Sequence, residues 1–159
     1  MKLSSIHQIN ESFEIEYYDS ESWEDDDLDP YDVVNKAEIV AHEAGVRISS
    51  NKELKFVALD RSYSDPIIGG VWIATYHDNE QDAIVFDFDV AVDKEFRSSA
   101  LIGLKLIETA IDEYKNLDYD RKYIKVWVIN PKLVRILERK YGFEIESEHG
   151  DGSAHMTYY

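Results

Sequence analysis

One segment in the middle of the chain constrains the fold most, because its hydrophobic period changes twice. AIVFDFDVAV (83–92) alternates, with Phe and Val on one face and Asp87 and Asp89 on the other, as a half-buried strand does. Residues 99–115 then repeat apolar side chains at helical spacing, and YIKVWVI (123–129) returns to a strand pattern. A strand, a helix and a strand in this order predict a crossover helix between two parallel strands.

Start and stop signals predict two more helices. One spans about residues 30–44, from the Asp29-Pro30 cap to Gly45, and the other runs from the Asn130-Pro131 cap to Gly142. Alternating or β-rich apolar runs predict the remaining strands, at 13–18, 54–60, 67–76, 143–147 and 154–159. The order β-α-β-β-β-α-β-α-β-β predicts a single α/β domain over residues 1–159, with a central mixed, mostly antiparallel sheet and helices on both faces.

Composition excludes several classes of function. The chain has no cysteine, so a disulfide, a thiolate metal site and a thiol nucleophile are all excluded. Its formal net charge of −16 disfavours direct binding to nucleic acid, whose phosphates attract clustered Lys and Arg, and favours a cationic partner. Because neither a signal-peptide pattern nor a run of about 18 apolar residues is found, we expect a soluble cytoplasmic protein that does not enter a membrane.

The charge is unevenly distributed along the chain. Residues 1–35 hold eleven acids and one Lys, whereas residues 121–141 hold seven bases against the single Glu138. This basic segment is either one of two solvated faces of opposite sign or a binding patch for an anion.

The element order and three local patterns resemble the GNAT superfamily of N-acetyltransferases over nearly the whole chain. The junction Val92-Asp-Lys-Glu-Phe-Arg97 is similar to the end of the family's fourth strand and its turn, and Gly103-Leu-Lys-Leu-Ile107 is similar to the start of its main helix. VWVINPKLVRILERKYGF (126–143) resembles the family's fifth strand, Asn, fourth helix and closing Gly-Phe. KFVALD and IIGGVWIA resemble its second and third strands.

The resemblance implies acetyl-CoA as the cofactor. The first N–H groups of the main helix and the positive end of its dipole would cradle the pyrophosphate, and the fourth strand would pair with the pantetheine. Basic residues of the last helix would meet the 3′-phosphate. The implied cofactor-binding residues are Val90, Ala91, Val92, Arg97, Ser98, Ser99, Ala100, Gly103, Asn130 and Arg135.

The chain departs from the family at the start of the main helix. Where the family usually has Gly-x-Gly, this chain has Ala100-Leu-Ile102, and alanine adopts a positive φ less readily than glycine does. Ser98 and Ser99 are small enough for fairly close approach to a phosphate. Alternatively, one of these serines simply caps a core helix.

The resemblance also implies direct attack of an amine on the thioester, where the fourth and fifth strands diverge. An acid on the fourth strand often serves as the base, which points to Asp87 or Asp89; the alternative is that both face solvent. The family's general-acid Tyr corresponds to Glu138, and the helical spacing of Tyr141 places it in the core. The five His residues show no metal-ligand spacing, and residues 25–29 do not match a calcium loop.

Residues 19–32, the acidic stretch, occupy the connection that helps wall the acceptor site in this family. The stretch would select a small cationic amine, such as a polyamine or an aminoglycoside, or a Lys-rich protein; alternatively it is a plain solvated loop. We therefore expect an acyl-CoA-dependent N-acetyltransferase with a cationic amine acceptor. The alternative is a non-catalytic protein that kept the fold and uses its acidic surface as a decoy for nucleic-acid-binding proteins or as an adaptor.

Overall fold

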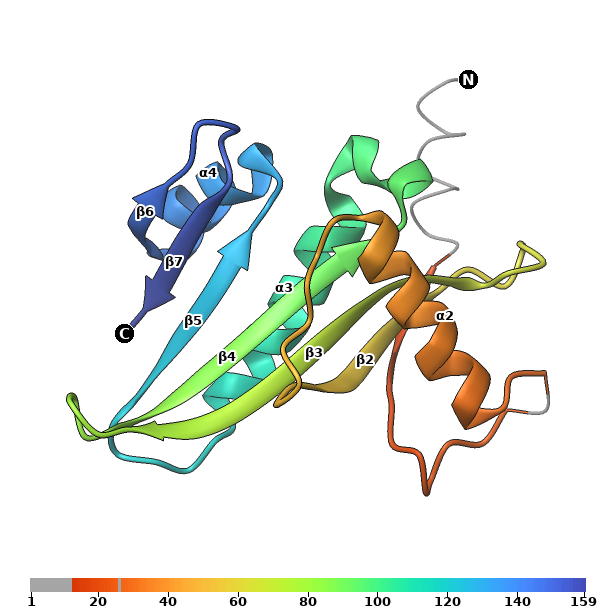
Figure 1. Ribbon diagram of the computed structural model, residues 1–159, viewed down its shortest axis with the longest axis horizontal. Coiled ribbons are helices and arrows are strands. Elements are labelled where there is room, and N and C mark those ends of the chain that lie inside the picture. The colour runs from red at the N-terminus through yellow and green to blue at the C-terminus, as the bar shows by residue number, and fades with distance from the viewer. Residues whose placement is uncertain (1–12, 26) are drawn as a thin grey trace.

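The structure, a computed structural model, describes residues 13–25 and 27–159, without the side chains of residues 97–99. The described strands form one seven-stranded sheet in the order β1-β2-β3-β4-β5-β7-β6 (Figure 1). They are β1 (Glu14–Tyr17), β2 (Glu53–Leu59), β3 (Ile67–Asp78), β4 (Ala83–Val92), β5 (Lys122–Val128), β6 (Glu144–Glu148) and β7 (Ala154–Tyr158). The described helices are α2 (Pro30–Glu43), α3 (Leu101–Lys115) and α4 (Pro131–Tyr141), with a 3-10 turn, η1, at Lys94–Ser99.

The predicted element order and sheet type are confirmed. Neighbouring strands pair antiparallel everywhere in this sheet except at β4 and β5, which are parallel. The chain crosses from β4 to β5 through α3, as the change of hydrophobic period predicts. The last hairpin places β7 between β5 and β6, so the final strand of the chain is not at the edge of the sheet.

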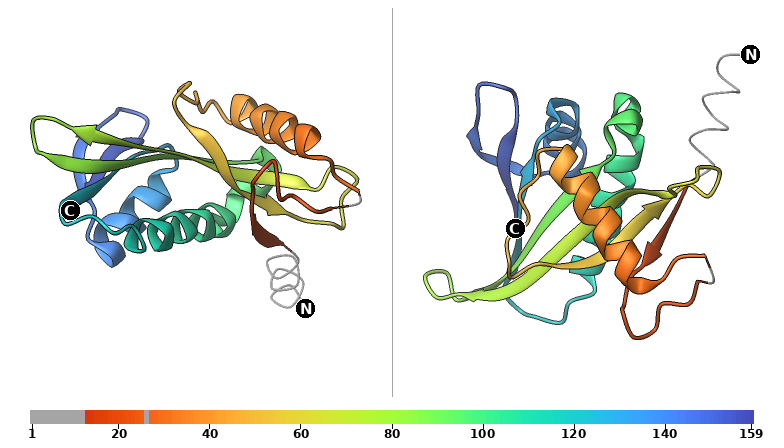
Figure 2. Two further views of the ribbon diagram at one scale, coloured as in Figure 1. Left: turned by 90° about the horizontal axis from the view of Figure 1, so that it is seen from below. Right: turned by 45° about the vertical axis from the view of Figure 1, so that its right-hand side comes forward.

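The helices cover both faces of the sheet (Figure 2). α2 packs on one face, next to Trp72 of β3. α3 and α4 pack on the other face, where their buried side chains join Phe86 and Phe88 of β4 in the larger core. Because side chains alternate along a strand, Asp87 and Asp89 lie on the α2 face.

β4 and β5 pair over only part of their length. Their register runs from Ile84 opposite Lys122 to Phe88 opposite Val126. β4 then continues to Val92 with β3 as its partner, and in Figure 1 the two strands diverge towards the N-terminus of α3. The edge of β4 that faces β5 is therefore open from residue 89 onward.

Capping residues explain where the helices begin and end. The side chain of Asn130 accepts a hydrogen bond from the N–H of Lys132 at the start of α4, and Gly142 ends α4 with a φ of 77°. α3 begins at Leu101, later than the expected residue 99, because η1 intervenes and Ala100 adopts a left-handed φ of 59°. Ala100 is the N-cap residue by its backbone position, and its side chain makes no capping hydrogen bond. The alternative in which Ser98 or Ser99 caps this helix concerns side chains that lie outside the described residues.

Candidate active site

A cavity of about 490 Å³ lies where β4 and β5 diverge. Its wall consists mainly of apolar side chains from β4, β5, α3 and the start of α4, and Ala44 and Val46, which follow α2, line it from the other face of the sheet. Six of the predicted cofactor-binding residues line this cavity. They are Val90, Ala91, Val92, Ala100, Gly103 and Asn130.

The other four predicted cofactor-binding residues are placed differently. Arg135 lies on the exposed side of α4, where its guanidinium contacts Glu148 (3.0 Å) and Glu138 (3.6 Å), and it does not line the cavity. The side chains of residues 97–99, predicted as Arg97, Ser98 and Ser99 of the phosphate site, lie outside the described residues. Their backbone belongs to η1.

The N-terminus of α3 opens onto this cavity. The first N–H groups of a helix, such as those of Ile102 and Gly103 here, have no intrahelical partner and lie at the positive end of the dipole. Glycine at 103 also allows close packing, because a Cβ at this position would lie 2.9 Å from Cδ1 of Leu133 on α4. This end of the cavity therefore offers backbone donors to an anion.

Asp87 and Asp89, the predicted bases, share one cation on the α2 face of β4. Nζ of Lys52, which precedes β2, is 3.0 Å from Oδ1 of Asp87 and 2.8 Å from Oδ2 of Asp89. The side chains of Lys52 and Asp89 are each 7% exposed, and that of Asp87 is 18% exposed. The alternative in which both carboxylates face solvent is therefore wrong for Asp89.

Asp89 is better placed than Asp87 for chemistry at the cavity. It follows Phe88, the last residue of β4 that pairs with β5, and precedes Val90, which lines the cavity. Asp87 lies inside the paired part of β4, and its Oδ2 accepts a hydrogen bond of 3.0 Å from the hydroxyl of Tyr76.

Burial and ion pairing together determine the charges of Asp89, Lys52 and Tyr76. Burial raises the pKa of Asp89; the contact with Lys52 opposes this rise, and the charge of Asp87 adds to it. Burial alone would lower the pKa of Lys52, but its hydrogen bonds and ion pairs with Asp89 and Asp87 outweigh burial and raise that pKa. Burial, followed by the charge of Asp87, raises the pKa of Tyr76 to about 12. Lys52 and Tyr76 are therefore protonated at neutral pH.

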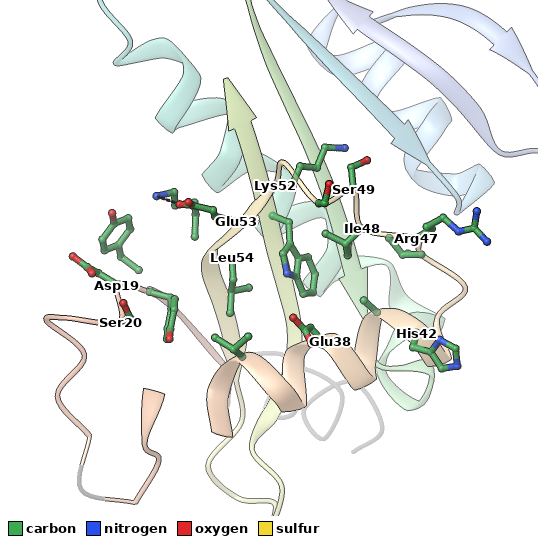
Figure 3. A pocket seen from close by; sticks show the side chains of 18 of the residues that line it. Asp19, Ser20, Glu38, His42, Arg47, Ile48, Ser49, Lys52, Glu53 and Leu54 are labelled. Atoms are coloured by element: carbon green, nitrogen blue, oxygen red, sulfur yellow. Dashed lines mark ion pairs between the residues drawn. The ribbon is translucent and has the colours of Figure 1, made fainter. Parts of the chain in front are cut away.

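A larger cavity, of about 1000 Å³, adjoins the first on the α2 face (Figure 3). Val46 lines both cavities, and Trp72 and Leu54 line the larger one between α2 and β2. Lys52 lines the larger cavity and its Nζ contacts Asp89, whereas Asp87 and Asp89 themselves are not among the residues that line it. Its acidic and basic lining residues are Asp19, Glu38, His42, Arg47, Lys52, Glu53 and Lys55.

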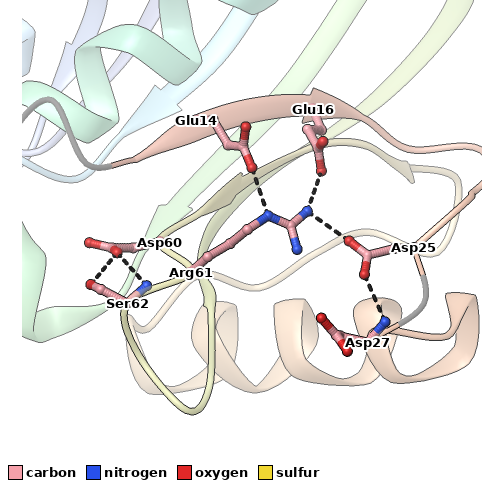
Figure 4. A network of polar contacts seen from close by, with 7 residues as sticks. All are labelled: Glu14, Glu16, Asp25, Asp27, Asp60, Arg61 and Ser62. Atoms are coloured by element: carbon pink, nitrogen blue, oxygen red, sulfur yellow. Dashed lines mark hydrogen bonds and ion pairs between the residues drawn. The ribbon is translucent and has the colours of Figure 1, made fainter.

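Part of the acidic stretch is held in place by an arginine. Figure 4 shows Arg61, between β2 and β3, in contact with Glu14 (2.9 Å) and Glu16 (3.4 Å) of β1 and with Asp25 (2.7 Å) of the stretch. Asp19, at the start of the stretch, lines the larger cavity. Asp25 is thus held by an ion pair while most of the described stretch is exposed, and Asp19 and Ser20 at its start line the larger cavity.

The remaining sequence predictions concern α4 and metal binding. Glu138 is exposed and paired with Arg135, so it does not replace the family's Tyr at the cavity. Tyr141 packs against the larger core, as predicted, and donates a hydrogen bond from its hydroxyl to Glu108.

Across residues 13–25 and 27–159, no group of His, Asp and Glu side chains could hold a metal ion. No helix in that part of the chain is long and apolar enough to cross a membrane.

Sequence reasoning missed Lys52 and Arg61. Both lie in polar connections, and their partners are far away in the chain: 37 residues separate Lys52 from Asp89, and 36 separate Arg61 from Asp25. The sequence signals a cation at this place, because two carboxylates on the same face of a buried strand need one beside them, but it does not identify Lys52 as that cation.

The chain is similar to known proteins in its structure, whereas its sequence alone matches none. No protein-family model matches the chain, and no curated protein matches its sequence. Solved structures match it over most of its length. Arabidopsis thaliana NAA60 in complex with a bisubstrate analogue has 16% identity and a TM-score of 0.62, with 92% of this chain and 98% of that chain covered.

Two bacterial proteins match similarly. An acetyltransferase of the GNAT family from Streptococcus pneumoniae has 14% identity and a TM-score of 0.57, with 92% of this chain and 98% of that chain covered. A GNAT superfamily phosphinothricin acetyltransferase from Sinorhizobium meliloti, in complex with AcCoA, has 14% identity and a TM-score of 0.59, with 92% and 88% covered. With the strand order and the parallel step between β4 and β5, these matches show that the chain has the fold of the GNAT superfamily of acetyltransferases.

Proposed function

We propose that the chain is an acyl-CoA-dependent N-acetyltransferase that moves an acetyl group to a cationic amine. The observation that carries this proposal is the cavity between the diverging ends of β4 and β5, with the N-terminus of α3 at one end and Asp89 next to it. Two of the matching structures, NAA60 and the phosphinothricin acetyltransferase, were solved with a bisubstrate analogue and with AcCoA, which supports the same kind of site here.

The residues around the cavity fit acetyl-CoA. The open edge of β4 offers backbone N–H and C=O groups with which an extended pantetheine arm can pair, at Val90, Ala91 and Val92. Ala100 and Gly103 lie at the end of α3 where backbone N–H groups can receive a pyrophosphate. When bound, acetyl-CoA would supply an acetyl group activated as a thioester. Asn130 and the apolar side chains of β5 would keep water from that group.

The larger cavity suits the acceptor. It lies on the α2 face of the sheet, its lining includes Asp19 and Glu38, and it is also lined by Lys52, whose Nζ contacts Asp89. With a net charge of −16, the protein attracts a cationic molecule such as a polyamine, an aminoglycoside or a Lys-rich segment. Asp89 would take a proton from the acceptor's ammonium group, and burial helps because it makes this carboxylate more basic. Water would protonate the leaving sulfur, since Glu138 faces away from the cavity.

The proposal predicts a difference between Asp89 and Asp87. Asp89→Asn should lower kcat/KM by about a hundredfold or more, the usual scale for a positioned base, without loss of CoA affinity. Asp87→Asn should have a smaller effect, because Asp87 lies in the paired part of β4. The measurement is thiol release from acetyl-CoA with spermidine, an aminoglycoside and a Lys-rich peptide as acceptors. If both Asn variants are as fast as wild type, Asp89 is not the base.

A non-catalytic binding protein of the same fold is the second candidate. The ion pairing of both β4 carboxylates favours it, because a carboxylate that already binds an ammonium group accepts a further proton less readily. Binding of CoA by wild type, with no acetyl transfer to any amine of the panel, would decide for this candidate.

A further inference from the structure

Lys52 is buried in a way that ordinary surface lysines are not. Its side chain is 7% exposed, and its ammonium group lies between Oδ1 of Asp87 and Oδ2 of Asp89. Burying a charged group is costly unless ion pairs and hydrogen bonds replace its water. Lys52 meets that condition, because two carboxylates from a distant strand converge on its Nζ.

The position of this ion pair matters because it involves the residue next to the cavity. Asp89 is where β4 separates from β5, and Lys52 contacts its Oδ2. Among the described residues, none donates a hydrogen bond to Oδ1 of Asp89. Lys52 therefore fixes one oxygen of the Asp89 carboxylate, and the other has no hydrogen-bond donor among the described residues.

We propose that Lys52 is a positioning residue of this site: its ammonium group keeps the Asp89 carboxylate ionised and oriented, with Oδ1 free to take the acceptor's proton. This inference rests on the proposed function. Lys52 would act through Asp89 and would touch neither acetyl-CoA nor the transferred acetyl group. Because the pKa of Lys52 is raised by its two carboxylates, it remains an ammonium ion and is a poor acetyl acceptor itself.

Removing the ammonium group should change how Asp89 ionises. Asp89 would then lie in a buried site beside the charge of Asp87. Burial and this repulsion both favour the protonated form of Asp89, which cannot act as a base. The other ionisable groups nearby are Tyr76 of β3, which donates to Asp87, and Lys125 of β5, which is in register with Asp87. Glu38 and His42 of α2 line the same cavity as Lys52.

The test compares Lys52→Met, Lys52→Arg and wild type, with spermidine and acetyl-CoA as substrates. Lys52→Met should lower kcat/KM by about tenfold or more at neutral pH, and the deficit should shrink as the pH rises from about 7 to about 9, because alkali ionises Asp89 again. Lys52→Arg should restore most of the activity, since a guanidinium also pairs with carboxylates. CoA affinity should be unchanged. A deficit that is the same at every pH, or none at all, would overturn the proposal.

Two further variants keep the test clear of folding effects. Lys36→Met removes a half-buried lysine of α2 that pairs with Asp65, away from Asp89, and its pH profile should match wild type. If Lys52→Met does not fold, Lys52→Met/Asp87→Asn removes one of the two repelling carboxylates. It should regain stability and still show Asp89 titrating at a higher pH than in wild type.

A direct titration separates this inference from the proposed function. NMR of the aspartate carboxyl carbons, assigned with Asp89→Asn, should show Asp89 titrating at higher pH without Lys52, whether or not the chain is an enzyme. If wild type transfers no acetyl group but this shift is seen, the proposed function fails while Lys52 still controls Asp89. If Asp89 titrates alike with and without Lys52, the positioning role is wrong.

Discussion

Ala100 holds a backbone conformation that favours glycine, with φ 59° and ψ −1° at the N-cap of α3. An L-residue in this region costs about 1–2 kcal/mol, whereas glycine adds about 0.4–1 kcal/mol of unfolded-state entropy. The buried methyl group of Ala100 offsets part of the difference. Ala100→Gly should therefore be neutral or raise the free energy of unfolding by up to about 1 kcal/mol, measured by urea denaturation.

The matched control for this substitution is Ala110→Gly in the middle of α3. Ala110 is fully buried in a right-handed helix, so glycine there should lower the free energy of unfolding by about 1 kcal/mol or more. If the two substitutions destabilise the protein equally, Ala100 does not occupy a strained position in solution.

At the scale of elements, Arg61 connects β1 to the acidic stretch through Glu14, Glu16 and Asp25. The network is partly exposed and screened by solvent, so Arg61→Met should lower the free energy of unfolding by only about 1 kcal/mol at neutral pH. The hydrogen bond with Arg61 is the main reason that the pKa of Asp25 is lowered.

The pH dependence of this network follows from the lowered pKa of Asp25. A lowered pKa stabilises the folded state above the ordinary aspartate value of 3.8, and the contribution is lost as the pH falls through the lower folded pKa. The difference between wild type and Arg61→Met should therefore persist down to about pH 4 and shrink below it. Urea unfolding at several pH values measures this, with Arg121→Met as an exposed arginine control. A difference that grows in acid would contradict the network.

The elements could be predicted from sequence because their signals are local. The Asn130-Pro131 cap, the Gly142 stop and the alternation in β4 each act within a few residues. The start of α3 was less predictable, because Ala100 takes a conformation for which its sequence carries no signal. Lys52 could not be placed either, since only tertiary folding brings it to Asp89.

At the scale of the whole molecule, the opening between β4 and β5 joins the two faces of the sheet. The smaller cavity has walls from α3 and α4 on one face and from the residues after α2 on the other, and the larger cavity adjoins it on the α2 face. A cofactor arm could enter from the side of α3, and an amine from the side of α2. Asp89 and Lys52 pair on the α2 face, where Lys52 lines the larger cavity.

The central claim is that the smaller cavity binds CoA, and titration calorimetry tests it most directly. Val90→Trp would fill the cavity from β4, whereas Ile39→Trp adds the same side chain on the exposed side of α2 and serves as its control. Wild type and Ile39→Trp should bind CoA and acetyl-CoA, and a large excess of ligand should raise the melting temperature of both. Val90→Trp should stay folded and lose this binding. If folded wild type shows no heat of binding and no rise in melting temperature at millimolar CoA, the account is contradicted.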